Sequence, residues 1–503
     1  MRSTDLIRFL SAALVALILG QAHAEEAKPN APAAQAKTAE DSIPRLTADS
    51  VTQHTIAAGG QQLTYKATAG TLPLFGPKGE VAANVFYVAY TLDAANPRPI
   101  TFAFNGGPGA AAAFLHLGAL GPRIVPFSEN GTEPVRPVTI TDNPNSWLAF
   151  TDLVFIDPVG TGYSRATGGG DAERAYWGVE KDADSLADFI RLYLTRSGRE
   201  LTPIFLTGES YGGFRVGLLS DRLLGMGLRL KGAVMISPAL EFSMMHGDDF
   251  AVLPLTFALP SLTASNFEMR EGPKAPLNTV HDAEAYARTS YLQHLADGLK
   301  RDDAVISALA KFTGLDPDLI AKHHGRVSAS LFIQEYRRRN DRALSRYDGT
   351  VSIPLPVPAD RNHFDPILDG AVSVLAPAAT QYFRLELGFR TDQQYRLLNR
   401  EVSGHWDFGT KPNQQGYAGS LDELQKARVR SPALKILIAH GYTDLVTYYS
   451  MSQYLVAHLL PIEGSSPIGI HVYRGGHMMY LRPASRGELA NDARALYESA
   501  LAP

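Results

Sequence analysis

The stretch Pro203-Ile-Phe-Leu-Thr-Gly-Glu-Ser-Tyr-Gly212 decides how this chain folds. Its apolar first half predicts a buried strand, and the residues after it predict a helix. A serine between glycines at a sharp strand-to-helix turn is held above the sheet, where its hydroxyl can attack a carbonyl carbon. Glycines are needed because a side chain at either position would collide with the neighbouring strand or helix. Ser210 is therefore the candidate nucleophile, although the same pattern also arises by chance in glycine-rich chains.

Two later strand ends carry the partners that such a serine needs. The apolar run Ile436-Leu-Ile-Ala439 leads to Asp444, and Ile468-Gly-Ile-His-Val-Tyr473 leads to His477. The order serine, acid, histidine is that of a hydrolase with a strand–turn–helix nucleophile. His477 would take the serine proton, while Asp444 would hold the imidazole tautomer and stabilise the imidazolium. Taken singly, Asp444 could cap a helix and His477 could be a turn histidine, but their joint order at strand ends favours a triad.

A glycine-rich turn predicts an oxyanion hole. Ile100-Thr-Phe-Ala-Phe104 reads as a strand that ends in Asn105-Gly-Gly-Pro-Gly109. Such a turn can aim a backbone N–H at the tetrahedral oxyanion, beside the N–H of the residue after the nucleophile. The predicted donors are Gly107 and Tyr211. A plain tight turn fits the same residues.

At this point the chain resembles the serine carboxypeptidases, peptidase family S10. The similarity covers roughly residues 85–240 and 405–490 and is carried by Asn105-Gly-Gly-Pro-Gly109, Asn143-Pro-Asn-Ser-Trp147, Phe155-Ile-Asp-Pro-Val-Gly-Thr-Gly-Tyr-Ser164, Gly208-Glu-Ser-Tyr-Gly-Gly213, the Asp444 loop and Gly475-Gly-His-Met478. The resemblance implies an α/β-hydrolase fold with an inserted lid, and removal of C-terminal residues from peptides. It also implies that Asn105 and Glu209 bind the substrate's free α-carboxylate. Glu209 must then be protonated, because two carboxylates in contact cannot both stay ionised.

The chain departs from the family pattern at three places. Ala110-Ala111 follow the glycine-rich turn where the family usually has Cys-Ser, and Ala103 stands where an aromatic residue is common. Ala119 precedes Leu120-Gly-Pro122 where the family often places a second glutamate, which shares a proton with the one beside the nucleophile. This last change puts the strength of carboxylate recognition, and the acidity of the optimum, in doubt.

The periodicity predicts a mostly parallel sheet with one insertion. Strands are expected near Ile100, Leu153, Ile204, Ala233, Ile436 and Ile470, with a helix over Glu180–Thr195. Residues 50–91 predict antiparallel edge strands turning at Gly59-Gly60. Helical patterns alone fill the insertion, around residues 282–299, 304–312 and 329–339. The predicted parts are a signal peptide (1–24), a disordered leader (25–45), the first part of the core (46–240), the lid (241–405) and the second part of the core (406–503).

The first residues predict export. Arg2 and Arg8 precede the apolar run 9–20, which is followed by Ala22-His-Ala24. A charged start, a short apolar run and small residues two apart are typical of a signal peptide, with cleavage after Ala24. The run is too short to span a bilayer comfortably. The chain has no cysteine, so it carries no lipid on cysteine and no disulfide. An exported, periplasmic or secreted protein of bacterial type is expected.

The remaining predictions concern partners and alternatives. The formal charge is −4 and no long basic stripe is present, which argues against a nucleic-acid partner. No metal or cofactor is predicted; the expected partners are peptides with a free C-terminus. The same triad also serves esterases, acyltransferases and broader serine peptidases, and a catalytically inactive envelope binding protein is a further alternative. His440 is interpreted as a structural histidine, and Met478-Met-Tyr480 as either substrate wall or core.

Overall fold

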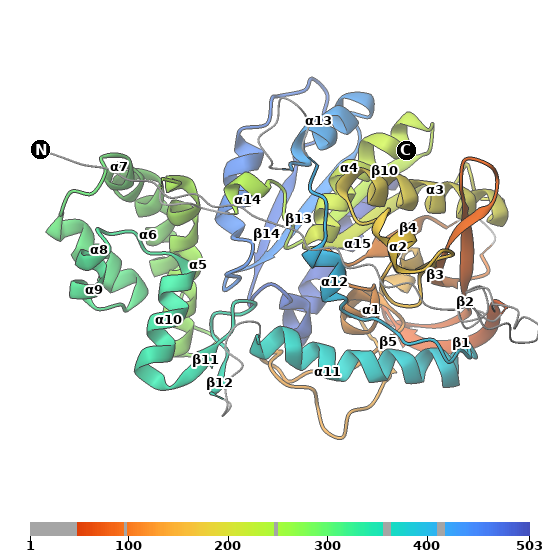
Figure 1. Cartoon of the computed structure of the whole chain (residues 1–503), viewed down its shortest axis with the longest axis horizontal. Coiled ribbons are helices and arrows are strands. Elements are labelled where there is room, and N and C mark those ends of the chain that lie inside the picture. The colour runs from red at the N-terminus through yellow and green to blue at the C-terminus, as the bar shows by residue number, and fades with distance from the viewer. Residues whose placement is uncertain (1–47, 95–97, 246–249, 356–363, 410–417, 503) are drawn as a thin grey trace, which may run out of the picture. The chain divides into compact units, whose positions relative to one another are not determined.

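The computed structural model of the chain describes residues 48–94, 98–245, 250–355, 364–409 and 418–502 (Figure 1). Over these residues the framework is a ten-stranded sheet in the order β1-β2-β3-β7-β4-β9-β10-β13-β14, with β8 (Arg165–Ala166) paired to β3 off this path. The predicted signal peptide and leader lie outside the described residues. Among the described helices, none combines the length and apolar character needed to cross a membrane.

The parallel part of the sheet confirms all six predicted strands. Neighbours are parallel throughout the set β7 (Asp152–Ile156), β4 (Ile100–Phe104), β9 (Ile204–Glu209), β10 (Leu230–Ile236), β13 (Lys435–Gly441) and β14 (Gly469–Tyr473). Every residue of β4, β7 and β9 is buried. Continuous burial is expected for parallel strands that are covered on both faces.

The edge strands are antiparallel, as predicted. β1 (Ser50–Ala58), β2 (Gln61–Phe75) and β3 (Val81–Thr91) form a meander, and β3 also pairs antiparallel with β7. The β1–β2 turn consists of Gly59 and Gly60, whose φ angles are +59° and +77°. Two consecutive residues with positive φ give the turn whose twist matches that of the flanking strands, and glycine adopts them without strain.

Two apolar cores cover the two faces of the sheet. Alternate residues of one strand belong to different cores: Leu153 and Phe155 to one, Val154 and Ile156 to the other. This is the two-residue period of a strand. The helices α3 (Val179–Ser197), α4 (Tyr211–Gly225) and α13 (Leu421–Arg430) cover one face. The helices α11 (Pro366–Gln381) and α15 (Pro483–Leu501) cover the other. The predicted helix over 180–195 is α3. The sheet and its two helical layers form the predicted α/β-hydrolase fold.

The insertion between β10 and β13 is mainly helical, as predicted. Its predicted helices correspond to α6 (Asn278–Tyr286) with its continuation to α7 (Leu292–Ala296), α8 (Asp303–Thr313) and α10 (Ala329–Asn340). Two longer helices, α5 (Val252–Glu271) and α11, were not predicted. Each contains an internal proline, Pro260 and Pro377, which in a sequence signals a helix end. The insertion also contains α9 (Pro317–Lys322) and the hairpin β11 (Arg342–Leu344)–β12 (Ser352–Pro354).

The inserted residues pack in two different ways. Helices α5 to α10 share an apolar cluster of their own, which Leu445 of the core joins. Helix α11, the long cyan helix of Figure 1, instead contributes Ile367, Ala371 and Leu375 to a core of the sheet. The limits 241 and 405 of a lid subdomain stay a prediction.

Candidate active site

The turn between β9 and α4 has the geometry predicted for a nucleophile. Ser210 has φ +60° and ψ −122°, a backbone conformation that L residues rarely adopt. The flanking glycines make it possible. A Cβ on Gly208 would collide with the backbone of Gly212, and one on Gly212 would lie 2.6 Å from the carbonyl oxygen of Phe104. The strain at Ser210 is therefore maintained by the close approach of β9, α4 and β4.

The structure brings Asp444 and His477 together. The Nδ1 atom of His477 lies 2.8 Å from Oδ2 of Asp444, and both side chains are fully buried. Asp444 also accepts hydrogen bonds from the N–H groups of Val446 and Thr447 and from the Thr447 hydroxyl. These donors fix the carboxylate, which in turn fixes the ring of His477 with Nδ1 toward the acid. Such an arrangement leaves Nε2 to act as a base.

Ser210 and His477 line the same small cavity, about 30 Å³ in volume. Nε2 of His477 is buried and has no hydrogen-bond partner among the described residues. Burial disfavours the imidazolium, but the Asp444 carboxylate and then Glu209 favour it, and the net effect raises the pKa of His477 above 6.5. The site thus stabilises the charge that His477 would acquire on taking the serine proton.

The predicted oxyanion donors lie beside this cavity. Tyr211 is the first residue of α4, so its N–H has no acceptor within the helix. Gly106 and Gly107 line the cavity, and Gly107 has φ +99°. A Cβ on Gly106 would collide with the backbone nitrogens of Tyr211 and Gly212. The absence of that side chain lets the turn after β4 lie directly against the start of α4, which places both predicted donors at one location.

Glu209 and Asn105 are in contact. The Asn105 Nδ2 group donates to Oε2 of Glu209, and its Oδ1 accepts from the N–H of Leu115 at 3.1 Å, which fixes the orientation of the amide. Glu209 lines the cavity next to Ser210. Burial raises the pKa of Glu209 from 4.5 to about 7, against opposing effects of His477, Tyr480 and Asn105. Glu209 is therefore protonated at mildly acidic pH, as binding of a carboxylate would require.

The other positions singled out in the sequence have apolar or structural surroundings: Ala119, residues 478–480 and His440. Ala119 is 1% exposed and lies in a core of the sheet. All three residues after His477 lie in that core, and Met478 also lines the cavity. Burial, and then the neighbouring Glu209 carboxyl, raise the pKa of Tyr480. His440 is buried with Nε2 2.8 Å from the Ser452 hydroxyl, and burial lowers its pKa to about 4, so it is neutral.

Several insertion residues at the site were not predicted from the sequence: Leu368 and Leu398, which line the small cavity, and the segment 345–350. The carbonyl of Tyr347 accepts from the N–H of His477 at 2.6 Å, and the two rings meet edge to face with centroids 5.1 Å apart. Asp348 accepts from the hydroxyl of Thr443 at 2.7 Å, and Gly349 N–H donates to the Thr443 carbonyl at 2.9 Å. The pair Asp348-Gly349 predicts a turn, but no local pattern indicates which loops that turn contacts.

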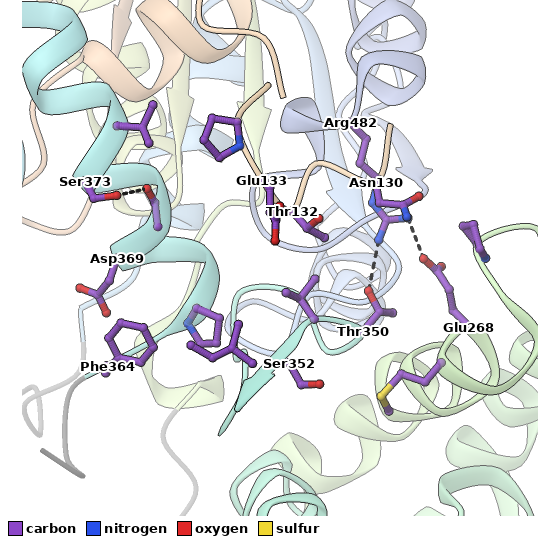
Figure 2. Close-up of a pocket in the computed structure, with 18 of the residues that line it drawn as sticks. Asn130, Thr132, Glu133, Glu268, Thr350, Ser352, Phe364, Asp369, Ser373 and Arg482 are labelled. Carbon is purple, nitrogen blue, oxygen red and sulfur yellow. Dashed lines mark hydrogen bonds and ion pairs between the residues drawn. The ribbon is translucent and has the colours of Figure 1, made fainter. Parts of the chain in front are cut away.

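A second, larger cavity of about 790 Å³ lies between the insertion and the core (Figure 2). Asp369 and Ser373 of α11 line one side and Glu268 of α5 lines another. Arg482, five residues after His477, donates to Glu268 at 2.7 Å and to Asp348 at 2.9 Å. These ion pairs connect α5 and the 345–350 segment to the chain that follows His477.

Comparison with known proteins agrees with this geometry. Residues 61–235 match the sequence pattern of the family described as serine carboxypeptidase. A segment of 249 residues is 27% identical to serine-type carboxypeptidase F of Aspergillus niger and covers 47% of this chain and 42% of that protein. A segment of 175 residues is 29% identical to serine carboxypeptidase-like 45 of Arabidopsis thaliana and covers 31% of this chain and 33% of that protein. The matched segments thus span less than half the length of these curated relatives.

The fold comparison extends over more of the chain. The crystal structure of Kex1(Δ)p, a prohormone-processing carboxypeptidase from Saccharomyces cerevisiae, superposes with a TM-score of 0.50 at 16% identity. The superposition covers 86% of this chain and 90% of that one. At this identity the likeness speaks for the fold alone. Residues 61–235 are thus similar in sequence to the serine carboxypeptidase family, and the superposition supports an α/β-hydrolase fold.

Proposed function

We propose that this protein is a serine-type carboxypeptidase, which removes C-terminal residues from peptides through an acyl-enzyme. Ser210 Oγ bonds to the scissile carbonyl carbon while its proton passes to Nε2 of His477, and the N–H groups of Gly107 and Tyr211 bind the oxyanion. Collapse breaks the C–N bond, and the leaving amine takes the proton from His477. Water then attacks the acyl ester with His477 again as base, which releases the shortened peptide and restores Ser210.

The observation that carries this proposal is the position and state of Glu209. Many hydrolases share the triad, but a buried carboxyl beside the nucleophile, bonded to Asn105 and with a pKa raised to about 7, is suited to a further carboxylate. A protonated Glu209 can donate a hydrogen bond to the substrate's C-terminus, and Asn105 Nδ2 has a second N–H for the same group. Recognition of a free C-terminus separates a carboxypeptidase from other serine hydrolases.

The direct test compares a peptide with its C-terminal amide. At pH 5–6, where Glu209 is protonated, the wild-type protein should cleave the free acid with a higher kcat/KM than the amide. Above pH 7 the ratio of kcat/KM for the acid to kcat/KM for the amide should fall toward one. Equal cleavage of the two peptides at every pH would instead favour a general esterase, an acyltransferase or a broader peptidase. The Ala119 methyl, buried where a second carboxyl could stand, is the feature that favours this alternative.

A fluorophosphonate distinguishes an enzyme from an inactive binding protein. Its attack requires a working nucleophile, base and oxyanion site but no peptide recognition. We expect the wild-type protein to be labelled and Ser210→Ala to be unlabelled. Failure to label a folded wild-type protein would leave the binding-protein alternative.

We also propose that the protein is an exported bacterial member of its family, periplasmic or secreted, with the signal peptide removed after Ala24. The support is the pattern of the first residues, from Arg2 to Ala24. The mature chain should begin at Glu25 and be recovered outside the cytoplasm. Finding residues 1–24 intact on protein from the membrane fraction would contradict both the cleavage and the localisation.

A further inference from the structure

A buried ion pair lies directly behind the glycine-rich turn. Arg215 of α4 is fully buried and pairs with Asp182 of α3, with Nε 2.7 Å from Oδ2 and Nη2 3.2 Å from Oδ1. This two-point contact uses two N–H groups on one edge of the planar guanidinium and fixes its orientation. The ring of Tyr211 lies 4.9 Å from the guanidinium carbon and that of Trp406 5.9 Å, so aromatic faces enclose the cation.

The remaining nitrogen of Arg215 contacts the turn itself. Nη1 donates to the carbonyl oxygen of Asn105 at 2.5 Å and lies 3.4 Å from that of Gly106. The Gly106 carbonyl and the Gly107 N–H belong to one peptide plane, and that N–H is a predicted oxyanion donor. Holding the carbonyl on the Arg215 side therefore directs the N–H away from Arg215. A cation at the carbonyl also polarises the peptide, which strengthens the hydrogen bond that its N–H can donate.

Flexibility of this turn makes such a contact consequential. Gly106 and Gly107 have no side chain to resist rotation of the peptide between them. The Gly106 carbonyl also accepts from the N–H of Ala110 at 3.1 Å, so Arg215 is a second donor that holds this carbonyl. An oxyanion donor contributes to rate only when it already points to the place where negative charge develops. We propose that Arg215, held by Asp182, is a positioning residue that fixes the 105–107 peptides and polarises the Gly107 N–H toward the oxyanion. This inference rests on the proposed function insofar as it assigns that N–H to the oxyanion.

If the ion pair between α3 and α4 is only structural, its loss should lower Tm but leave kcat unchanged. The test therefore measures kcat of the double variant Asp182→Asn/Arg215→Met. Replacing both partners avoids leaving one buried charge unpaired, which would be strongly destabilising. The kcat on a peptide and on a small ester should fall on the order of 10²-fold, as for loss of one oxyanion donor. KM should be unchanged, because the lost interaction acts in the transition state.

The chain offers a control ion pair at the opposite edge of the sheet, where the parallel strands begin. Arg199 also pairs with a buried aspartate, Asp152, at 2.6 Å and also donates to a carbonyl, that of Arg98, whose guanidinium pairs with Asp152 as well at 3.0 Å. Asp152→Asn/Arg199→Met should lower Tm at least as much as the Arg215 double variant, because Arg98 also loses its carboxylate, and should leave kcat close to wild type. An equal loss of kcat in both double variants, a kcat for the Arg215 variant equal to wild type, or a change in KM alone would overturn the proposal.

Two further outcomes are covered by the same measurements. If the Arg215 double variant does not fold, Arg215→Lys replaces it in the test. Lysine keeps the charge but cannot reach Asp182 and both carbonyls at once, so kcat should fall. An unchanged kcat for Arg215→Lys would overturn the proposal. Failure of the proposed function has its own signature. If the wild type cleaves esters but not free-acid peptides, the carboxypeptidase assignment falls while the ester kcat still tests Arg215. If a folded wild-type protein is not labelled by the fluorophosphonate, both the proposed function and the role assigned to Arg215 are wrong.

Discussion

The serine turn and the two loops that carry Asp444 and His477 are held in place by different means. At the turn, the backbone of β9, α4 and β4 packs so closely that only glycine fits at 208 and 212. At the two loops, the supports are hydrogen bonds from a distant segment, residues 345–350 of the insertion. The Ser210 turn is thus positioned by strands and a helix of the core, whereas the loops of Asp444 and His477 also depend on the insertion. The difference teaches that a change in the insertion can shift His477 without disturbing the Ser210 turn.

The largest effect on kcat should come from replacing Ser210 or His477. Ser210→Ala and His477→Ala should each lower kcat on the order of 10⁶-fold, with normal folding shown by circular dichroism, because triad members act as a unit. For the same reason the double variant should be little worse than either single one. Losses that multiply in the double variant would show that the two regions act independently and would contradict the triad.

The next effect concerns the acid alone. Asp444→Asn should lower kcat on the order of 10⁴-fold, because an amide at 2.8 Å from Nδ1 favours the wrong imidazole tautomer. Fluorophosphonate labelling should slow in parallel. A loss of less than tenfold would indicate that Asp444 is a helix-capping residue.

A smaller effect tests the insertion. Thr443→Val removes the hydroxyl that joins the Asp444 loop to Asp348, and we expect kcat to fall by up to about 10²-fold through misplacement of the acid and base. Thr350→Val is the matched control, because its hydroxyl donates to the same Asp348 oxygen at the same distance of 2.7 Å but lies within the insertion. It should lower Tm comparably and leave kcat near wild type. Equal kcat values for the two variants would remove the role assigned to the 345–350 segment.

The smallest effect is one of pH dependence. A free-acid peptide requires neutral Glu209, so its cleavage should decline as pH rises through about 7, while loss of basic His477 sets the acidic limb for every substrate. Glu209→Gln keeps a donor that cannot ionise and should weaken the alkaline decline for the acid but not change the profile for the amide. Unaltered profiles on both peptides would reduce Glu209 to a structural residue of the turn.

Stability gives a second measurement on the same variant. The pKa of Glu209 is raised in the folded state, from 4.5 to about 7, so its stabilising contribution is complete below pH 4.5 and is lost as pH rises through 7. The Tm of the wild type should therefore decline relative to that of Glu209→Gln between pH 5 and pH 8. A constant difference in Tm would contradict the burial of an ionisable group at this position.

Residues whose roles depend on local geometry could be predicted from the sequence. The buried strands have continuous apolar runs, and the serine turn requires glycines next to it, so the fold class and the placing of Ser210, Asp444 and His477 at strand ends followed from patterns a few residues long. The family resemblance implied that Asn105 and Glu209 bind the same substrate carboxylate, and the structure places the two residues in contact. The catalytic roles themselves stay predictions until the variants are measured.

Residues whose roles depend on distant contacts could not be predicted. Tyr347 and Asp348 lie far along the chain from the loops they contact, and nothing around them differs from an ordinary turn. Arg215 looks like a polar residue on a helix, whereas it is buried because Asp182 of another helix neutralises it. Helices α5 and α11 were missed because Pro260 and Pro377 mimic helix ends, although tertiary packing keeps both helices continuous.

The order of the strands also has a consequence for the making of the protein. The strand before Ser210 pairs with β4 and β10, both of which precede the insertion, so its neighbours are synthesised before residue 240. By contrast, β13 pairs with β10 only across the whole insertion, and β14 follows last. Because distant strands pair late, a growing chain should form the Ser210 turn long before His477, the proposed base, is in place. A nascent or truncated chain that lacks β14 should therefore be unable to hydrolyse the peptides around it, and hydrolytic competence begins only when synthesis is nearly complete.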